Sequence, residues 1–158
     1  MADEIRIRPV RQSDFDRWLP LWDGYNAFYD RSGPTALDAG ITRVTWSRFF
    51  DEKIPVHGLV AERGDGLVGL VNYLFHYSTT AIGQTCYLQD LFTSEAARGQ
   101  GVGRALIERV YVEAERAGAT RVYWQTHETN ATARILYDKV ADLSGFIVYR
   151  KLLEYQRG

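Results

Sequence analysis

The sequence predicts an α+β (α/β) fold, in which a mixed and mainly antiparallel central sheet is flanked by helices on both faces. Short alternating or apolar segments, separated by turn residues, predict a run of strands in the middle of the chain. Periodic helical segments stand before and after that run. A strand–helix–strand crossover in the second half then requires parallel pairing of its two strands.

The first half of the chain predicts one strand, two helices and two further strands. Residues 5–9 alternate and end in proline, which suits the end of a strand. Ser13 or Asp14 can cap the following helix, but Pro20 predicts a kink or a break into two short helices. The later elements of this half are a helix at 42–50 and strands at 58–62 and 67–75, joined by a tight turn at 63–66.

The second half predicts a crossover followed by one more helix and strand. Gly118 suits the end of the crossover helix, and Thr129 or Asn130 can cap the last helix. In chain order the expected elements are a strand at 85–93, a helix at 102–117, a strand at 121–126, a helix through Tyr137 and a final strand at 145–153.

Length and composition are those of one ordinary globular domain over residues 1–158, with 46% hydrophobic and 25% charged residues. The net charge of −1 gives no general attraction to nucleic acid or to an anionic membrane. The single Cys86 excludes an internal disulfide and is expected to be an inert core thiol. No signal peptide or apolar span is found, which predicts a cytoplasmic location.

A glycine-rich turn at residues 98–103, Arg-Gly-Gln-Gly-Val-Gly, lies between a predicted strand and a helix. This geometry presents backbone N–H groups to a diphosphate, and glycines let the backbone approach it closely. Arg98 adds a fixed positive charge. A dinucleotide-binding fold is disfavoured, because its glycine turn follows the first strand rather than the fourth.

The turn fits the pattern Arg/Gln-x-x-Gly-x-Gly/Ala in full, and the order of elements resembles the GNAT superfamily of acyl-CoA N-acetyltransferases. The resemblance extends from residue 5 to about residue 153. Residues 87–93, Tyr-Leu-Gln-Asp-Leu-Phe-Thr, are similar to the spermidine/spermine acetyltransferases, and residues 123–137 to the histone-and-polyamine acetyltransferases.

This resemblance implies acetyl-CoA as the acyl donor, with CoA as a product. The backbone at residues 92–94 would pair with the pantetheine arm like an added strand, which requires the loop-bearing strand to splay from its neighbour. Asn130 would bind the arm beyond the splay, and Tyr137 would reach the sulfur. The implied cofactor contacts are Phe92, Thr93, Ser94, Arg98, Gly99, Gln100, Gly101, Val102, Gly103, Arg104, Asn130 and Tyr137.

Acetyl transfer to an amine needs a neutral nitrogen, whereas a free alkylammonium has a pKa of about 10.4. The site must therefore bind a cation, remove a proton and stabilise an oxyanion, for which a backbone N–H near Phe92 or Thr93 is suited. A tyrosine hydroxyl can protonate the leaving thiolate, and we assign that role to Tyr137. Tyr137 follows Asn130 by seven residues, which places both on one helical face.

Asp90 is expected either to contact the cation or to act as the base through a water molecule. Polyamine acetyltransferases carry an acidic pair where this chain has Gln89 and Asp90, so the chain departs from that pattern at Gln89, whose amide cannot act as a base. Adjacent strand residues face opposite sides, so both side chains enter one cleft only if the strand bulges there. A structural hydrogen bond for Asp90 remains the alternative.

The acceptor amine is expected to contact side chains from the first helix and from the central strands. Aromatic residues at helical spacing usually form core, but Tyr25, Tyr29 or Asp30 could hold an ammonium group. The expected substrate-binding residues are Tyr25, Tyr29, Gln89, Asp90 and His127. His76 and His127 could also act as bases, and the spacing of the histidines predicts no metal site.

The sequence thus predicts an N-acetyltransferase that moves an acetyl group directly from acetyl-CoA to a primary amine of a small molecule, polyamine-like or amino-acid-like. A protein lysine or N-terminal acceptor is the alternative within the enzyme class, and a non-catalytic CoA-binding regulatory module is the alternative outside it. Expected partners are the small amine and, from the resemblance, a second copy in a homodimer through the C-terminal strand, with neither nucleic acid nor membrane.

Overall fold

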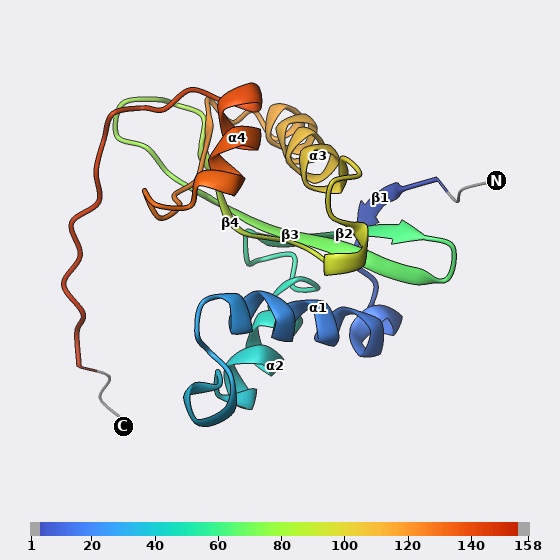
Figure 1. Ribbon diagram of the computed structural model, residues 1–158. Coiled ribbons are helices and arrows are strands. Elements are labelled where there is room, and N and C mark those ends of the chain that lie inside the picture. The colour runs from blue at the N-terminus through green and yellow to red at the C-terminus, as the bar shows by residue number, and fades with distance from the viewer. Residues whose placement is uncertain (1–3, 155–158) are drawn as a thin grey trace. The chain divides into compact units, whose positions relative to one another are not determined.

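A computed structural model describes residues 4–154, and Figure 1 shows its helices and strands. The chain divides into two compact units, residues 1–125 and 126–158, which are described separately. The elements of the first unit are β1 (Arg6–Pro9), η1 (Gln12–Asp14), α1 (Phe15–Phe28), η2 (Gly33–Thr35), α2 (Ala39–Arg48), β2 (Val56–Arg63), β3 (Gly66–His76), β4 (Thr85–Thr93), η3 (Glu95–Ala97), α3 (Val102–Arg116) and β5 (Val122–Tyr123).

The first unit is built on a five-stranded sheet in the order β1-β2-β3-β4-β5. The pairs from β1 to β4 are antiparallel, and β5 runs parallel to β4 after the α3 crossover. A tight turn joins β2 to β3, where Gly64 has a φ of 57° that favours glycine. The mixed, mainly antiparallel sheet is therefore as predicted.

Helices cover both faces of the sheet, as predicted: α1 and α2 lie on one face and α3 on the other (Figure 1). Helix α1 is continuous through Pro20, so the chain does not break there into two short helices. Proline removes one backbone hydrogen bond of the helix. Burial of Trp18, Leu21 and Trp22 along the helix outweighs that loss, because packing rather than propensity supplies most helical stability.

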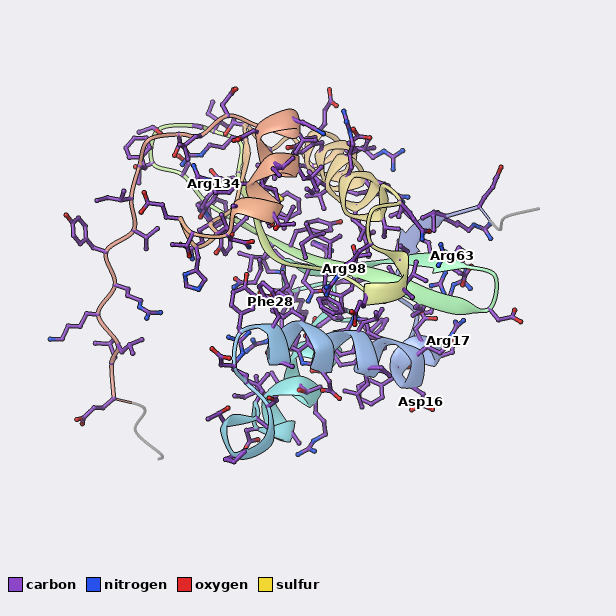
Figure 2. The ribbon with its side chains drawn as sticks, in the orientation of Figure 1. Asp16, Arg17, Phe28, Arg63, Arg98 and Arg134 are labelled. Atoms are coloured by element: carbon purple, nitrogen blue, oxygen red, sulfur yellow. The ribbon has the colours of Figure 1, made fainter. Side chains whose placement is uncertain are left out.

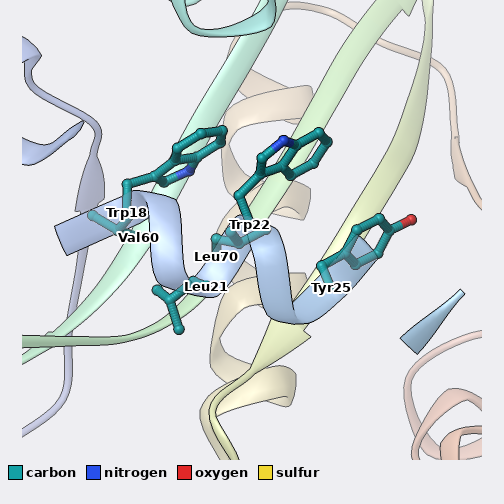
Figure 3. Packing of buried hydrophobic residues seen from close by; sticks show 6 residues of the cluster. All are labelled: Trp18, Leu21, Trp22, Tyr25, Val60 and Leu70. Carbon is teal, nitrogen blue, oxygen red and sulfur yellow. The ribbon is translucent and has the colours of Figure 1, made fainter. Parts of the chain in front are cut away.

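The core on the α1 face is aromatic (Figure 3). Trp18, Trp22 and Tyr25 stack in succession, with ring centroids 5.3 and 5.7 Å apart. They pack in one cluster with Val60 of β2 and Leu70 of β3. The aromatic periodicity of this segment thus marks a core face, and that core supports the floor of the site described below.

A buried ion-pair network ties β1 to the start of α1. Arg8 donates to both carboxylate oxygens of Asp14, at 2.8 and 2.9 Å, and also reaches Glu62 of β2 at 2.8 Å. Asp14 precedes α1 but makes no capping bond to the helix; it accepts from the Arg11 backbone and from Arg17 instead. The Arg8 hydrogen bonds lower the pKa of Asp14 to about 2.

The second unit contains α4 (Ala131–Val140), which begins as predicted with an Asn130 cap that accepts from the Ala133 N–H at 3.4 Å. The predicted final strand at 145–153 is wrong: the described residues from 142 onward have no regular secondary structure and are exposed. A strand needs a neighbour for its backbone groups, and the described part of this unit offers no other strand. The expected strand at 121–126 is likewise reduced to β5.

Candidate active site

A β-bulge in β4 lies at the centre of the sheet. Asn72 of β3 pairs with Asp90, but the next residue, Tyr73, pairs with Leu88, so Gln89 has no partner on β3. The extra residue turns neighbouring side chains of β4 toward the same side. Gln89 and Asp90 both line one cavity, which is the condition that the sequence set for their joint entry into a cleft.

This cavity has a volume of about 440 Å³ and lies between the sheet, α1 and α2. Its walls are largely apolar, with Trp22, Leu37, Ile41 and Phe49 among them. A few polar groups interrupt these walls: Asn26, Arg31, Thr45, Arg48, Asn72, Gln89 and Asp90. An apolar cavity with a few convergent polar groups is typical of a small-molecule site.

Asp90 is the only acidic side chain that lines the cavity among the described residues, and it is 8% exposed. Its Oδ2 accepts from Asn72 Nδ2 at 3.0 Å, and the Tyr25 hydroxyl is a second hydrogen-bond partner. Burial raises the pKa of Asp90, although both hydrogen bonds and the charge of Arg31 oppose the rise. The carboxylate is thus a stronger proton acceptor than an exposed aspartate.

Tyr25 and Tyr29, the predicted cation contacts, lie close to Arg31. The Arg31 guanidinium lies 5.8 Å from the ring centroid of Tyr25 and 5.4 Å from that of Tyr29. Burial, with Asp90 close by, raises the pKa of Tyr25, so its hydroxyl stays protonated and donates to Asp90. The two rings thus already contact a cation that belongs to the protein itself.

Beyond the bulge, β4 separates from β5. The two strands pair only at Cys86–Val122 and Tyr87–Tyr123, whereas β4 continues to Thr93. Within residues 4–154, residues 88–93 therefore have no partner on the β5 side, which is the splay that the sequence analysis required. Side chains stabilise the last paired position: the Tyr87 and Tyr123 rings lie 4.8 Å apart, and Gln125 donates to the Tyr87 hydroxyl.

The glycine-rich loop connects this open strand to α3. Gly99 and Gly101 have φ values of 75° and 83°, which favour glycine, and a Cβ at either position would meet no atom within 4 Å. No side chain caps the start of α3 at Gly101. The loop is thus open, and the first amides of the helix are available to an anion.

Arginine side chains hold this loop from two directions (Figure 2). Arg98 donates to the Thr93 carbonyl at 3.3 Å and lies over the Phe92 ring. Arg63, the last residue of β2, donates to the Gln100 side chain. The predicted loop residues are therefore joined to the end of β4 and to the β2–β3 hairpin.

Glycines also let two helices approach the open strand. A Cβ on Gly69 of β3 would lie 2.9 Å from Val102 Cγ1, so the start of α3 packs directly on the sheet. A Cβ on Gly24 of α1 would lie 2.8 Å from Phe92 Cζ. These contacts fix the positions of the loop and of Phe92.

Three of the remaining predicted site residues, Asn130, Tyr137 and His127, belong to the second unit. Asn130 caps α4 and donates to Thr126 at 3.2 Å, and Tyr137 is partly buried on the same helix. His127 is exposed, and its carbonyl accepts from the Asn130 N–H. The roles assigned to these three residues stay predictions. Cys86 is buried as expected, and burial raises its pKa to about 12.

His76 belongs to the sheet edge, where its Nε2 lies 2.8 Å from the Tyr123 hydroxyl. Sequence reasoning missed five polar residues of the cavity, namely Asn26, Arg31, Thr45, Arg48 and Asn72. Asn72 is the one that a pattern could have revealed, because it interrupts an otherwise apolar strand. Arg31 and Arg48 gave no such signal, since exposed-looking arginines are common near helix ends.

The chain matches the family model described as "Acetyltransferase (GNAT) family" over residues 18–142. It is 34% identical over 152 residues to the D-amino-acid N-acetyltransferase HPA3 of Saccharomyces cerevisiae, which covers 94% of this chain and 91% of that protein. It is 33% identical over 140 residues to the thialysine N-epsilon-acetyltransferase of Mus musculus, with coverages of 84% and 80%.

The fold is similar to that of solved acetyltransferases. An aminoglycoside acetyltransferase from an uncultured soil metagenomic sample, in complex with trehalose, superposes with a TM-score of 0.78 over 96% of this chain and 97% of that one. At 15% identity that likeness concerns the fold alone. Taken with the family match and the full-length relatives, the open strand and glycine loop identify this chain as a member of the acetyltransferase (GNAT) family, an acyl-CoA-dependent N-acetyltransferase.

Proposed function

We propose that the protein transfers an acetyl group from acetyl-CoA to the primary amine of a small molecule, polyamine-like or amino-acid-like, with both substrates bound at once. One observation supports this above all: β4 carries a buried carboxylate at Asp90 and, directly after it, an unpaired backbone edge that leads to the glycine loop. A strand arranged in this way can place an acyl donor beside an amine. The relatives from yeast and mouse are both named for small-molecule amine substrates.

The residues present fit acetyl-CoA as the donor. The open space at Gly99 and Gly101 and the uncapped start of α3 suit a diphosphate, which would accept from the amides between Gly99 and Arg104. The backbone of residues 92–94 would hold the pantetheine arm as an added strand on the β5 side, where residues 92–93 have no strand partner among the described residues. The N–H and carbonyl of Ser94 already bond to Val68 and Ala97. When bound, acetyl-CoA supplies an activated acyl thioester.

Asp90 would hold the acceptor and take its proton. Most of an alkylamine is protonated near neutral pH, so the site must first attract a cation and then neutralise it. The buried carboxylate does the first through its charge, and its raised pKa favours the second, directly or through one water molecule. Gln89 beside it cannot accept that proton, which leaves Asp90 as the base.

Tyr137 would protonate the sulfur of the leaving thiolate. A tyrosine hydroxyl within hydrogen-bond reach of that atom is a suitable general acid. Its place on α4, two turns after the Asn130 cap, supports a shared role for the two residues toward the donor. This role rests on the resemblance and on helical spacing.

A small amine is favoured over a protein lysine or N-terminus. A peptide-binding groove for a cationic segment would be expected to have acidic walls. The walls here combine aromatic and aliphatic side chains with Arg31 and Arg48, and Asp90 is the one acid among the described lining residues. This composition suits a compact amine that binds within the cavity.

We further propose a cytoplasmic homodimer that binds neither nucleic acid nor membrane. Among the described residues, no helix is both long and apolar enough to span a bilayer. The segment 145–153 exposes Phe146, Ile147, Val148, Tyr149 and two leucines, and pairing with a second copy would cover such apolar side chains. Sedimentation of the full chain and of a chain ending at residue 144 tests this dimer.

The test of the activity is thiol release from acetyl-CoA across a panel of small primary amines, with a lysine-containing peptide as a separate arm. The proposal expects turnover with at least one small amine, strong dependence on Asp90, and little turnover of the peptide. Tight CoA binding by calorimetry without turnover of any amine would contradict it and favour a regulatory module. Preference for the peptide would favour the protein acceptor.

A further inference from the structure

The acceptor cavity carries more positive than negative charge. Arg31 and Arg48 both line it, against the single carboxylate of Asp90 among the described lining residues. Within residues 4–154, neither arginine has a carboxylate oxygen within 4.0 Å. A second ammonium group, as on a diamine, would therefore meet guanidinium charge that no carboxylate of the described residues pairs.

The side chain of Arg31 is fixed by a hydrogen bond and by two aromatic rings. Its Nε donates to Asn26 Oδ1 at 2.7 Å, and its guanidinium lies over the Tyr25 and Tyr29 rings. Asn26 is itself 3% exposed and is fixed by a bond to the Trp22 carbonyl. With Nε occupied, the two terminal nitrogens of Arg31 are left as a planar pair of donors, which matches a carboxylate.

Asp90 and Asn72 offer hydrogen-bond acceptors in the same cavity. Asp90 is buried and accepts one of the two N–H donors of the Asn72 amide. Asn72 Oδ1 is buried and has no hydrogen-bond partner within the described part of the chain. The remaining acceptor capacity of Asn72 Oδ1 and of the Asp90 carboxylate suits a group with several N–H bonds, such as an ammonium.

We infer that the acceptor is a zwitterionic amino acid, whose ammonium group binds at Asp90 while its carboxylate is held by Arg31. The inference deepens the proposed function and rests on it, since the amine at Asp90 is the one to be acetylated. Arg31 becomes a specificity-determining residue, Asn26 its positioning residue, and the apolar walls receive the amino-acid side chain. The product keeps its carboxylate on Arg31 and loses the positive charge at Asp90.

The test compares three acceptors that differ at one group: phenylalanine, in both enantiomers, phenylalaninamide and phenethylamine. The wild type should acetylate phenylalanine about a hundredfold more efficiently, in kcat/KM, than either molecule without a carboxylate, because those leave Arg31 unpaired. Arg31→Met should lower kcat/KM for phenylalanine by about a hundredfold. It should change kcat/KM for phenylalaninamide by less than about tenfold, because that acceptor loses no carboxylate contact and is affected through the pKa of Asp90 alone. Arg31→Lys should retain part of the activity, as it keeps the charge without the planar pair.

Arg43→Met is the matched control, since Arg43 is an exposed arginine of α2 that does not line the cavity. Arg43→Met should leave kcat/KM for all three acceptors unchanged. Equal use of phenylalanine and phenylalaninamide by the wild type would overturn the inference while leaving the proposed acetyltransfer intact. So would an equal loss for both substrates in Arg31→Met, with thermal melting used to confirm that the variant is folded.

A binding readout separates the two proposals. Calorimetry with N-acetylphenylalanine, added to the CoA-saturated protein, measures the carboxylate site without turnover. Binding by the wild type that Arg31→Met weakens at least tenfold supports the inference even if no acceptor is acetylated, in which case the proposed function alone fails. Binding that Arg31→Met does not alter overturns the inference.

Discussion

Asn72 Nδ2 donates to Asp90 Oδ2 at 3.0 Å across the position where β3 and β4 fall out of register. The pair connects the bulge in β4 with the orientation of the buried Asp90 carboxylate. The bulge turns Gln89 and Asp90 toward one cavity, and the hydrogen bond orients the buried carboxylate within it. The same strand then opens toward the glycine loop. Its two consecutive segments are thus suited to the two substrates of an acyl transfer.

Asp90→Asn should lower kcat/KM by roughly a hundredfold to ten-thousandfold, because the amide can neither attract the cation nor take its proton. The wild type should lose activity as the pH falls through the raised pKa of Asp90, and the variant should lack that step. Initial rates from pH 4 to pH 9 measure both effects. Asp23→Asn, at an exposed position of α1, is the control. A pH profile that is identical in Asp90→Asn would remove Asp90 as the base.

Asp90→Asn should also make the folded protein more stable to heat than the wild type at pH 7. The folded-state pKa of Asp90 is raised, so the folded protein binds its proton more tightly than the unfolded chain does. Its contribution to stability is therefore greatest below the unfolded pKa of about 3.9 and is lost as the pH rises through the folded pKa. Thermal melting should show a higher Tm for Asp90→Asn at pH 7, and a difference that shrinks toward pH 4. A lower Tm for Asp90→Asn than for the wild type at pH 7 would contradict the claim that the buried Asp90 carboxylate destabilises the folded protein.

Gly101→Val should weaken CoA binding, because its side chain would enter the open space before α3 and its φ of 83° is strained for valine. Calorimetry with CoA measures this. Gly118→Val is the matched control: Gly118 has a similar φ of 75° and open surroundings at the other end of the same helix. The control should lose stability without losing affinity. Equal losses of affinity in the two variants would show an effect of strain alone.

Tyr137→Phe should lower kcat by roughly tenfold to a thousandfold with little change in CoA affinity, if its hydroxyl protonates the leaving thiolate. Tyr149→Phe, at an exposed tyrosine of the same unit, should have no effect. Steady-state rates from pH 6 to pH 10, combined with calorimetry, separate kcat from binding. An unchanged kcat across this range would exclude Tyr137 as the acid.

Asp14→Asn should reduce the free energy of unfolding by about 3 kcal/mol at pH 7, because it leaves Glu62 as the one carboxylate paired with the buried Arg8 among the described residues. The lowered pKa means that the stabilisation is present above the ordinary value of 3.8 and is lost as the pH falls through about 2. Urea unfolding at pH 7 and pH 3 measures this. Asp16→Asn is the exposed control on the same helix. A change at pH 7 no larger than that of Asp16→Asn would contradict the account of the network.

The sequence predicted well those elements whose hydrophobic periodicity is set by the face that each element buries. Strand 85–93 has the predicted bounds, and helix α3 ends within one residue of its prediction, because an alternating or amphipathic pattern is set by the face that the element buries. The final strand failed for the opposite reason. Residues 145–153 have strand-like composition, but a strand depends on a pairing partner that periodicity does not specify.

Some parts of the candidate site could likewise be predicted from the sequence, and others could not. The glycine loop could be recognised because its residue types follow from its backbone. For Gln89 and Asp90, the alternation rule showed that a bulge was needed without showing that it exists. Arg31 could not be found at all, because its place in the cavity depends on how residues 29–38 connect α1 to α2 and on its contact with Asn26.

The central claim is that an acyl-CoA binds along the open edge of β4 and on the loop before α3. Amide hydrogen exchange with and without CoA measures this most directly, peptide by peptide. The account predicts slower exchange at residues 88–94 and at residues 99–104 when CoA is added, with Gly101→Val losing the effect at both. Protection confined to other parts of the chain, with these two segments unchanged, would contradict it.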